Sequence, residues 1–188
     1  MKKSRRNSGF SLIELLCALL ILVILVIGIG VSMDAGVGIY RDATFEAESA
    51  TLAGILNTSL GDILRYSMDV RVPSAAEKAE KGVPENVEFL FTSLDYGIQD
   101  AYFYIPPHIS GGTMGPVQMK NLRNPAVVEL VNTGAYPDLV VSNFEIEYSP
   151  REDAGVKGGY FEISYLISSE TDAAKTRSVE TIVRLMND

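Results

Sequence analysis

The chain has 188 residues, which is long enough for one globular domain and a separate apolar segment. Its formal net charge of -8 at pH 7 makes the chain a poor candidate for coating nucleic acid, because binding phosphates requires clustered Lys and Arg. With Cys17 and His108 as the only cysteine and histidine, an intrachain disulfide, a cysteine-based zinc site and a multi-histidine metal site are also excluded.

The charge is distributed unevenly along the chain. Four of the 16 basic residues lie within the first nine positions, and the remaining 12 face 24 acidic residues from Phe10 onward. Such an acidic body favours solubility and cationic partners.

The segment that follows the basic start is apolar over a length typical of a membrane helix. Residues 15–31 contain no polar side chain, and the wider stretch 10–33 comprises 24 residues. A helix of that length reaches ~36 Å, enough to cross a hydrocarbon core of ~30 Å. The upstream basic residues predict a cytoplasmic N-terminus, with Asp34 onward outside. An ordinary secretory signal peptide and a plain uncleaved anchor are the alternatives, although the apolar run exceeds the usual length of a signal peptide.

Glu14 lies inside this apolar start. A carboxylate in hydrocarbon costs up to ~3 kcal/mol and usually faces a partner. One interpretation is that Glu14 lies near the cytoplasmic interface and bends toward water. The other interpretation is that Glu14 pairs with a cation at the same depth in the membrane. No basic residue can supply it, because none occurs between Arg6 and Arg41. Cleavage before Phe10 would create one, as an α-amino group.

The run KKSRRNSG followed by FSLIELL resembles the signal of type IV pilins and the related type II secretion pseudopilins and competence pilins. In that pattern Gly9 ends a basic leader, Phe10 begins the mature chain and Glu14 is its fifth residue. The resemblance implies cleavage between Gly9 and Phe10 by a prepilin peptidase, which also methylates the new amine. It further implies that Glu14 pairs with the Phe10 amine of a neighbouring subunit during filament assembly.

The resemblance predicts four segments along the chain. They are a cleaved leader (1–9), a transmembrane and filament-core helix (10–33), its amphipathic continuation (34–66) and an extracytoplasmic β-rich head (67–188). The implied location is the cytoplasmic membrane as a single-pass protein, followed by a pilus or pseudopilus at the cell surface. The implied partners are the prepilin peptidase, other pilin or minor pilin subunits, the membrane and the pilus assembly platform.

The membrane helix carries small residues at a regular spacing. Gly28, Ser32 and Gly36 recur every four residues, which places them on one face and permits close approach of another helix. The same residues could instead provide flexibility, and both interpretations stay open. No proline precedes Pro73, so the sequence leaves open whether the helix is kinked.

The second half of the helix is expected to be amphipathic and to pack on the head. Over residues 41–66 the apolar positions share one broad face. They are Phe45, Leu52, Ile55, Leu56, Leu60 and Ile63.

Beyond the helix the pattern predicts an antiparallel sheet with one buried side, and therefore an α+β fold. Residues 73–86 are predicted to form a loop or a short helix, 105–116 a surface loop, 149–159 a long hairpin turn and 169–176 a second turn. The candidate strands are residues 87–91, 101–105, 127–131, 139–148, 160–168 and 178–186.

No motif in the chain indicates catalysis or a cofactor. The phosphate loop, HExxH, CxxC and GxSxG patterns are absent, and His108 is expected to be a surface residue of a loop. The acidic clusters Glu145/Glu147 and Glu152/Asp153 are candidates for calcium or, more simply, solvated strand and turn charges. We therefore expect no cofactor, no metal site and no nucleic-acid contact.

Two functional hypotheses follow. The first is a non-enzymatic structural subunit of a type IV pilus, pseudopilus or competence filament. Within it, the run LGDILRYS and the closing strands ending in RSVETIVRLMN are similar to minor pilins of the PilW and PulJ/GspJ type. The second is a membrane-anchored extracytoplasmic binding or enzymatic domain that does not enter a filament.

Overall fold

The computed structural model divides the chain into two compact units, Met1–Thr44 and Phe45–Asp188. The expectations for Gly9, Phe10 and His108 fall outside the residues that it describes. The described residues are 11–94, 96–106, 116–124, 127–131, 133–153 and 156–186.

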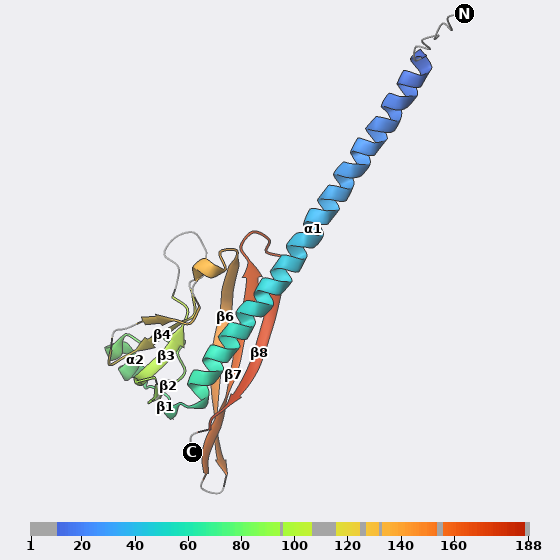
Figure 1. Cartoon of the computed structure of the whole chain (residues 1–188). Coiled ribbons are helices and arrows are strands. Elements are labelled where there is room, and N and C mark those ends of the chain that lie inside the picture. The colour runs from blue at the N-terminus through green and yellow to red at the C-terminus, as the bar shows by residue number, and fades with distance from the viewer. Residues whose placement is uncertain are drawn as a thin grey trace, which may run out of the picture. The chain divides into compact units, whose positions relative to one another are not determined.

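One helix, α1 (Leu12–Arg65), forms the N-terminal part of the structure (Figure 1). It contains no proline, and its glycines do not interrupt it. In the first unit its apolar side chains are exposed, from Leu12 to Tyr40. α1 is the one helix in the described part of the chain that is long and apolar enough to cross a membrane.

In the second unit α1 is amphipathic. Leu52, Leu56, Leu60 and Leu64 recur every four residues and are buried. The prediction that Ile55 belongs to this face is wrong, since Ile55 is 39% exposed. At about 100° per residue, it projects roughly 120° from the middle of the buried stripe.

After the helix, the chain forms a five-stranded antiparallel sheet with the order β1-β2-β3-β4-β5. The pattern did not predict β1 and β4, which have four residues each and contain polar side chains. The strands are β1 (Met68–Arg71), β2 (Leu90–Ser93), β3 (Ile98–Tyr104), β4 (Gln118–Asn121) and β5 (Val127–Glu129). A 3-10 turn, η1 (Thr133–Ala135), follows.

The charged, alanine-rich segment between β1 and β2 is a short helix, α2 (Ala75–Lys81). Ser74 caps its start, because the hydroxyl of Ser74 accepts a hydrogen bond from the backbone N–H of Glu77. Gly82 ends it with a left-handed φ of 63°. Of the two alternatives for this segment, the short helix is therefore correct.

The last part of the chain forms a second antiparallel sheet of β6 (Leu139–Asp153), β7 (Val156–Ser169) and β8 (Thr176–Arg184). The head thus has two sheets where a single one was expected. The predicted turn at 169–176 is confirmed, since β7 ends at Ser169 and β8 begins at Thr176.

The predicted long turn at 149–159 is wrong, because most of it belongs to β6 and β7. Pro150 pairs with Gly159, although both residue types usually mark turns. Gly159 leaves room for the ring of Tyr148, since a Cβ at residue 159 would lie 2.6 Å from Tyr148 Cε2. Close approach of a side chain thus explains a glycine within a strand.

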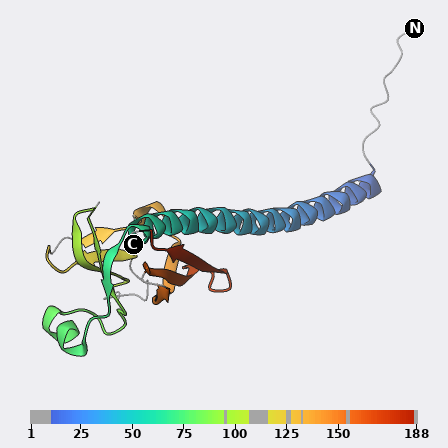
Figure 2. The same ribbon diagram turned by 90° about the horizontal axis from the view of Figure 1, so that it is seen from below.

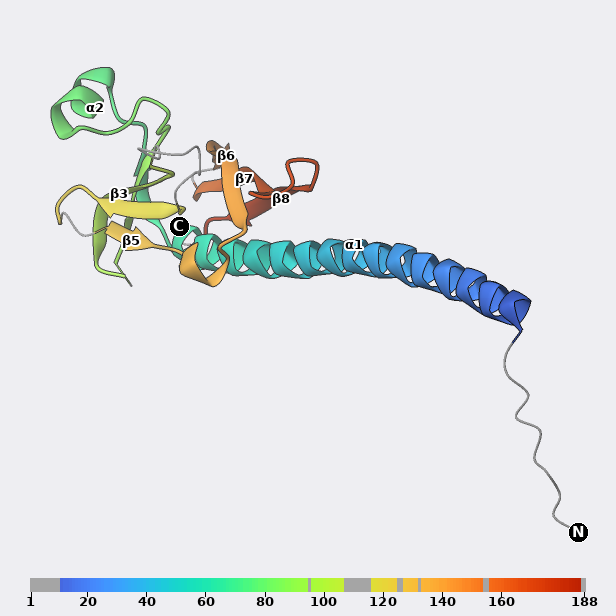
Figure 3. The ribbon, with the colours of Figure 1, turned by 90° about the horizontal axis from the view of Figure 1, so that it is seen from above.

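The main core lies between the C-terminal part of α1 and the sheets. From β7, Phe161, Ile163, Tyr165 and Ile167 are fully buried on one side. The rings of Phe161 and Phe89 lie 5.0 Å apart and connect β7 to the segment just before β2. In Figures 2 and 3 the three-stranded sheet lies along this part of α1, and the five-stranded sheet lies beside the C-terminal end of the helix.

Candidate functional site at the start of the helix

The first turn of α1 is closed by two reciprocal hydrogen bonds between Ser11 and Glu14. The backbone N–H of Ser11 donates to Glu14 Oε2 at 3.0 Å, and the backbone N–H of Glu14 donates to Ser11 Oγ at 3.3 Å. The N–H of Leu15 donates to the carbonyl of Ser11 at 3.2 Å, which begins the helical ladder. This arrangement is a capping box, and it satisfies N–H groups that the first turn of any helix leaves without a partner.

The capping box gives Glu14 a structural role that the sequence reasoning missed. The signal was present as SLIE, residues 11–14, which fits the pattern Ser-x-x-Glu before an apolar run. A negative charge is also favoured at this end of a helix by the macrodipole. Among the described residues, no hydrogen bond or ion pair joins Glu14 Oε1 to a partner, so one carboxylate oxygen can accept a bond from another molecule.

The small residues Gly28, Ser32 and Gly36 form an exposed stripe of α1. A Cβ added at Gly28 or Gly36 would meet nothing within 4 Å. The hydroxyl of Ser32 donates to the carbonyl of Gly28 at 2.8 Å. The stripe therefore offers a narrow surface whose one hydroxyl is already satisfied within the helix, as a hydrocarbon environment requires.

A charge network in the head connects β1, α2 and β3. The guanidinium of Arg71 donates two hydrogen bonds of 2.7 Å to the carboxylate of Glu77, and Nη2 of Arg71 also donates to Asp100 Oδ1 at 2.9 Å. Lys81 contacts Glu77 at 2.8 Å. Hydrogen bonds from Arg71 and then from Lys81 lower the pKa of Glu77 to about 2, and those to Glu77 and Asp100 raise the pKa of Arg71. Because each group is paired, we assign this network to stability.

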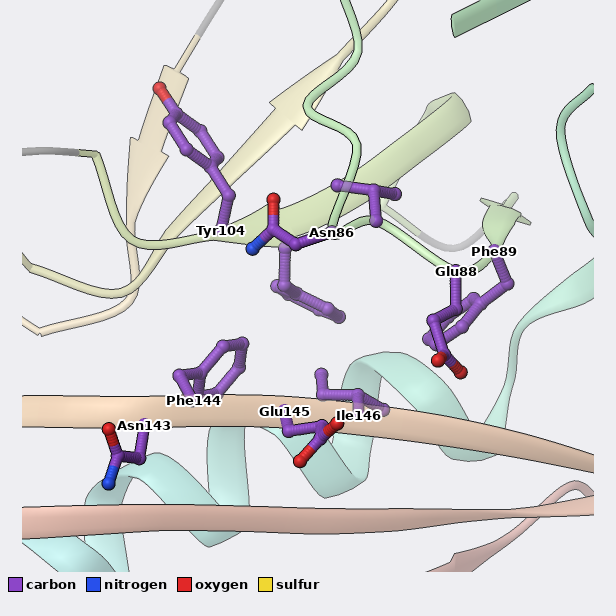
Figure 4. Close-up of a pocket in the computed structure, with 10 residues that line it drawn as sticks. Asn86, Glu88, Phe89, Tyr104, Asn143, Phe144, Glu145 and Ile146 are labelled. Carbon is purple, nitrogen blue, oxygen red and sulfur yellow. The ribbon is translucent and has the colours of Figure 1, made fainter. Parts of the chain in front are cut away.

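A cleft of about 420 Å³ lies between the segment before β2, the end of β3 and the middle of β6 (Figure 4). Its described lining combines apolar rings with carboxylates and amides, and none of these described residues is His, Cys, Ser, Lys or Arg. Such a lining can hold an apolar or cationic group but offers no nucleophile with an adjacent base. The lining residues are Asn86, Val87, Glu88, Phe89, Phe103, Tyr104, Asn143, Phe144, Glu145 and Ile146.

The described residues contain no group of three or more His, Cys, Asp or Glu side chains that could hold a metal ion. Glu145 and Glu147 lie on the same face of β6, two residues apart. The side chains of Glu152 and Asp153 are outside the described part of the structure.

Comparison with known proteins locates the similarity in the N-terminal segment. Residues 4–30 match the family described as the prokaryotic N-terminal methylation motif. The matched range includes Gly9, Phe10, the capping box and Gly28. No curated protein and no solved structure matches the chain.

Proposed function

We propose that this chain, whose N-terminal methylation motif supports a type IV pilin-like prepilin, is in its mature form a non-enzymatic structural subunit of a type IV pilus or pseudopilus filament. The observation that carries the proposal is the coincidence of the motif with a helix whose first turn holds a carboxylate in an otherwise apolar, exposed segment.

Processing is the first step of the proposed route. A prepilin peptidase cleaves between Gly9 and Phe10 and methylates the amine of Phe10. The basic residues before Gly9 keep the N-terminus in the cytoplasm, and the head, residues 67–188, lies outside. Residues 10–33 hold the subunit in the membrane until the assembly platform transfers it into a filament.

Assembly then uses Glu14. The capping box keeps its carboxylate beside the start of the helix, and Oε1 is available for the Phe10 amine of a neighbouring subunit. In a low-dielectric bundle of helices such a pair is strong, whereas one unpaired charge is costly. We therefore assign the Glu14–Phe10 contact to the axial register between subunits.

The stripe of Gly28, Ser32 and Gly36 supports the lateral contact. Small side chains allow two helices to approach closely and gain van der Waals contact. In this proposal the stripe packs against the apolar helix of the next subunit.

The processing step is tested by intact-mass measurement of the protein from cells with and without the prepilin peptidase. The expected mass in the first case is that of residues 10–188 plus one methyl group, and in the second that of the full chain. An intact N-terminus in cells that contain the peptidase contradicts the proposal.

The alternative function is a membrane-anchored binding domain outside a filament, and the cleft beside β6 is the observation that favours it. Filaments sheared from cells distinguish the two. Recovery of the mature chain in the sheared fraction supports the filament subunit, and its copy number relative to the shaft subunit separates a major from a minor pilin.

A further inference from the structure

β6 is an edge strand beside a cleft. It pairs with β7 through one edge, and no described strand pairs with its other edge. Asn143 to Ile146 line the cleft (Figure 4). The register of β6 shifts between Ser142 and Glu145, and Asn143 has a φ of 50°. From Glu145 onward the register is regular, and this unpaired edge presents backbone N–H and C=O groups to an incoming strand.

The two sides of this edge differ in chemistry. Phe144 and Ile146 point from β6 into the cleft, toward the segment that carries Phe89 (Figure 4). Glu145 and Glu147 belong to the opposite, outer face of the sheet, where both are exposed. A strand added to this edge would therefore meet apolar groups on one side and carboxylates on the other.

The carboxylates around the edge are not neutralised within the described residues. Glu88, Glu145 and Glu147 are exposed and form no ion pair there. Glu147 also lies directly opposite Glu162 of β7, an arrangement of like charges that is unfavourable in a sheet. A basic side chain beside Glu147 would relieve that repulsion.

We propose that the free edge of β6 binds an extended segment of another protein in which basic and apolar side chains alternate. The apolar side chains enter the cleft of about 420 Å³, and the basic ones contact Glu145 and Glu147. The charges select a different protein over a second copy, because this chain carries 24 acidic against 16 basic residues. This inference does not depend on the chain's being a filament subunit.

The probe is a labelled seven-residue peptide of alternating lysine and valine, added to the full chain in a nonionic detergent at low salt. A second peptide carries the same residues with the lysines in one block. A third has the alternating sequence with backbone N-methyl groups, which remove donors along the peptide without changing its side chains. Binding is measured by fluorescence anisotropy, and protection of β6 amides by hydrogen exchange.

The test variant neutralises three carboxylates at the edge, Glu88→Gln, Glu145→Gln and Glu147→Gln. The matched control neutralises three exposed carboxylates elsewhere, Asp62→Asn, Glu80→Gln and Glu85→Gln. Both variants change the net charge equally, so a difference between them reports the location of binding. Circular dichroism checks that both are folded.

The alternating peptide is expected to bind the wild type and the control variant alike, and the edge variant about tenfold more weakly. N-methylation should weaken binding by about the same factor, and the peptide should slow amide exchange in β6. Absence of binding, equal binding of the blocked or N-methylated peptide, or equal loss in the control variant would overturn the inference. The last three outcomes would indicate general attraction between opposite charges.

Discussion

The hydroxyl of Tyr165 in β7 lies 2.9 Å from Oδ1 of Asn57 in α1 and donates a hydrogen bond to it. The same hydroxyl is 3.2 Å from the carbonyl of Ala53. Tyr165 is 2% exposed, so this contact joins the helix to the sheet within the core of the head.

Replacing Tyr165 with Phe should lower the free energy of unfolding of the head by about 1 kcal/mol, because it removes the donor and leaves Asn57 without it. Chemical denaturation of both proteins measures the difference. A double-mutant cycle with Asn57→Ala isolates the pair, and a coupling energy near zero would contradict the assigned hydrogen bond.

Tyr165 should also make the head less stable at alkaline pH. Burial raises the pKa of Tyr165 from 10 to about 12, an effect that Arg177 partly opposes. The folded state therefore keeps the Tyr165 proton while the unfolded state loses it, and stability falls as pH rises from about 10 to about 12. The decline should be steeper in the wild type than in Tyr165→Phe, and parallel curves would refute the assignment.

The Arg71–Glu77 ion pair should make stability fall as the pH is lowered into the acid range. This is the opposite direction to the effect of Tyr165, which lowers stability as the pH rises. The pKa of Glu77 is lowered from 4.5 to about 2, so its stabilising contribution is present at neutral pH and is lost as pH falls from about 4.5 to about 2. Glu77→Gln should remove this part of the acid dependence of unfolding. Glu80→Gln, on the exposed side of the same helix, should leave the dependence as in the wild type.

Two glycine substitutions should have opposite effects. Gly159→Ala places a Cβ 2.6 Å from Tyr148 Cε2 and should lower the free energy of unfolding by about 1–3 kcal/mol through crowding. Gly54→Ala meets nothing within 4 Å on an exposed helical position and should raise it by up to about 1 kcal/mol. Thermal unfolding of both variants measures the two changes, and a Gly159→Ala variant as stable as the wild type would show that the packing of Tyr148 on Gly159 is misassigned.

At the start of α1, capping and intersubunit pairing can be separated by two substitutions. Glu14→Gln keeps an acceptor for the N–H of Ser11 and removes the charge, because glutamine also serves in a capping box. Ser11→Ala removes the capping hydroxyl and keeps the charge. Under the proposed function, Glu14→Gln should reduce the amount of mature chain in sheared filaments at least about tenfold, and Ser11→Ala much less.

A contrary result has a defined meaning. Equal losses in the two variants would assign Glu14 to helix capping alone. Immunoblots of membranes from both strains confirm that the processed subunit is present.

The sequence predicted the parts of the fold that follow from strong periodicity. The apolar run before Asp34 and the spacing of Leu52, Leu56 and Leu60 are local patterns, and both segments belong to α1. The strands around Tyr165 show an alternation that a half-buried sheet requires.

The parts that failed depend on contacts between distant residues. In the sequence Gly159 is typical of a turn. Only its contact with the ring of Tyr148 in the folded chain explains why a glycine lies within the strand. β1 is too short for a periodic signal, and its Arg71 gains its partners through tertiary contacts with Glu77 and Asp100. The capping box differs from these features, because SLIE at residues 11–14 is a local Ser-x-x-Glu pattern that predicts it without any tertiary contact.

The capping box has a consequence for the moment of processing. Ser11 and Glu14 both lie after the proposed cleavage point, so the same hydrogen bonds can begin the helix before and after the cut. The cut changes the group that precedes the capping box, because the neutral backbone amide of Phe10 becomes an ammonium group. A cation at the positive end of its own helix dipole is unfavourable. Under the proposed route, cleavage therefore makes an isolated subunit less stable in the membrane than one whose new amine reaches a neighbour's carboxylate.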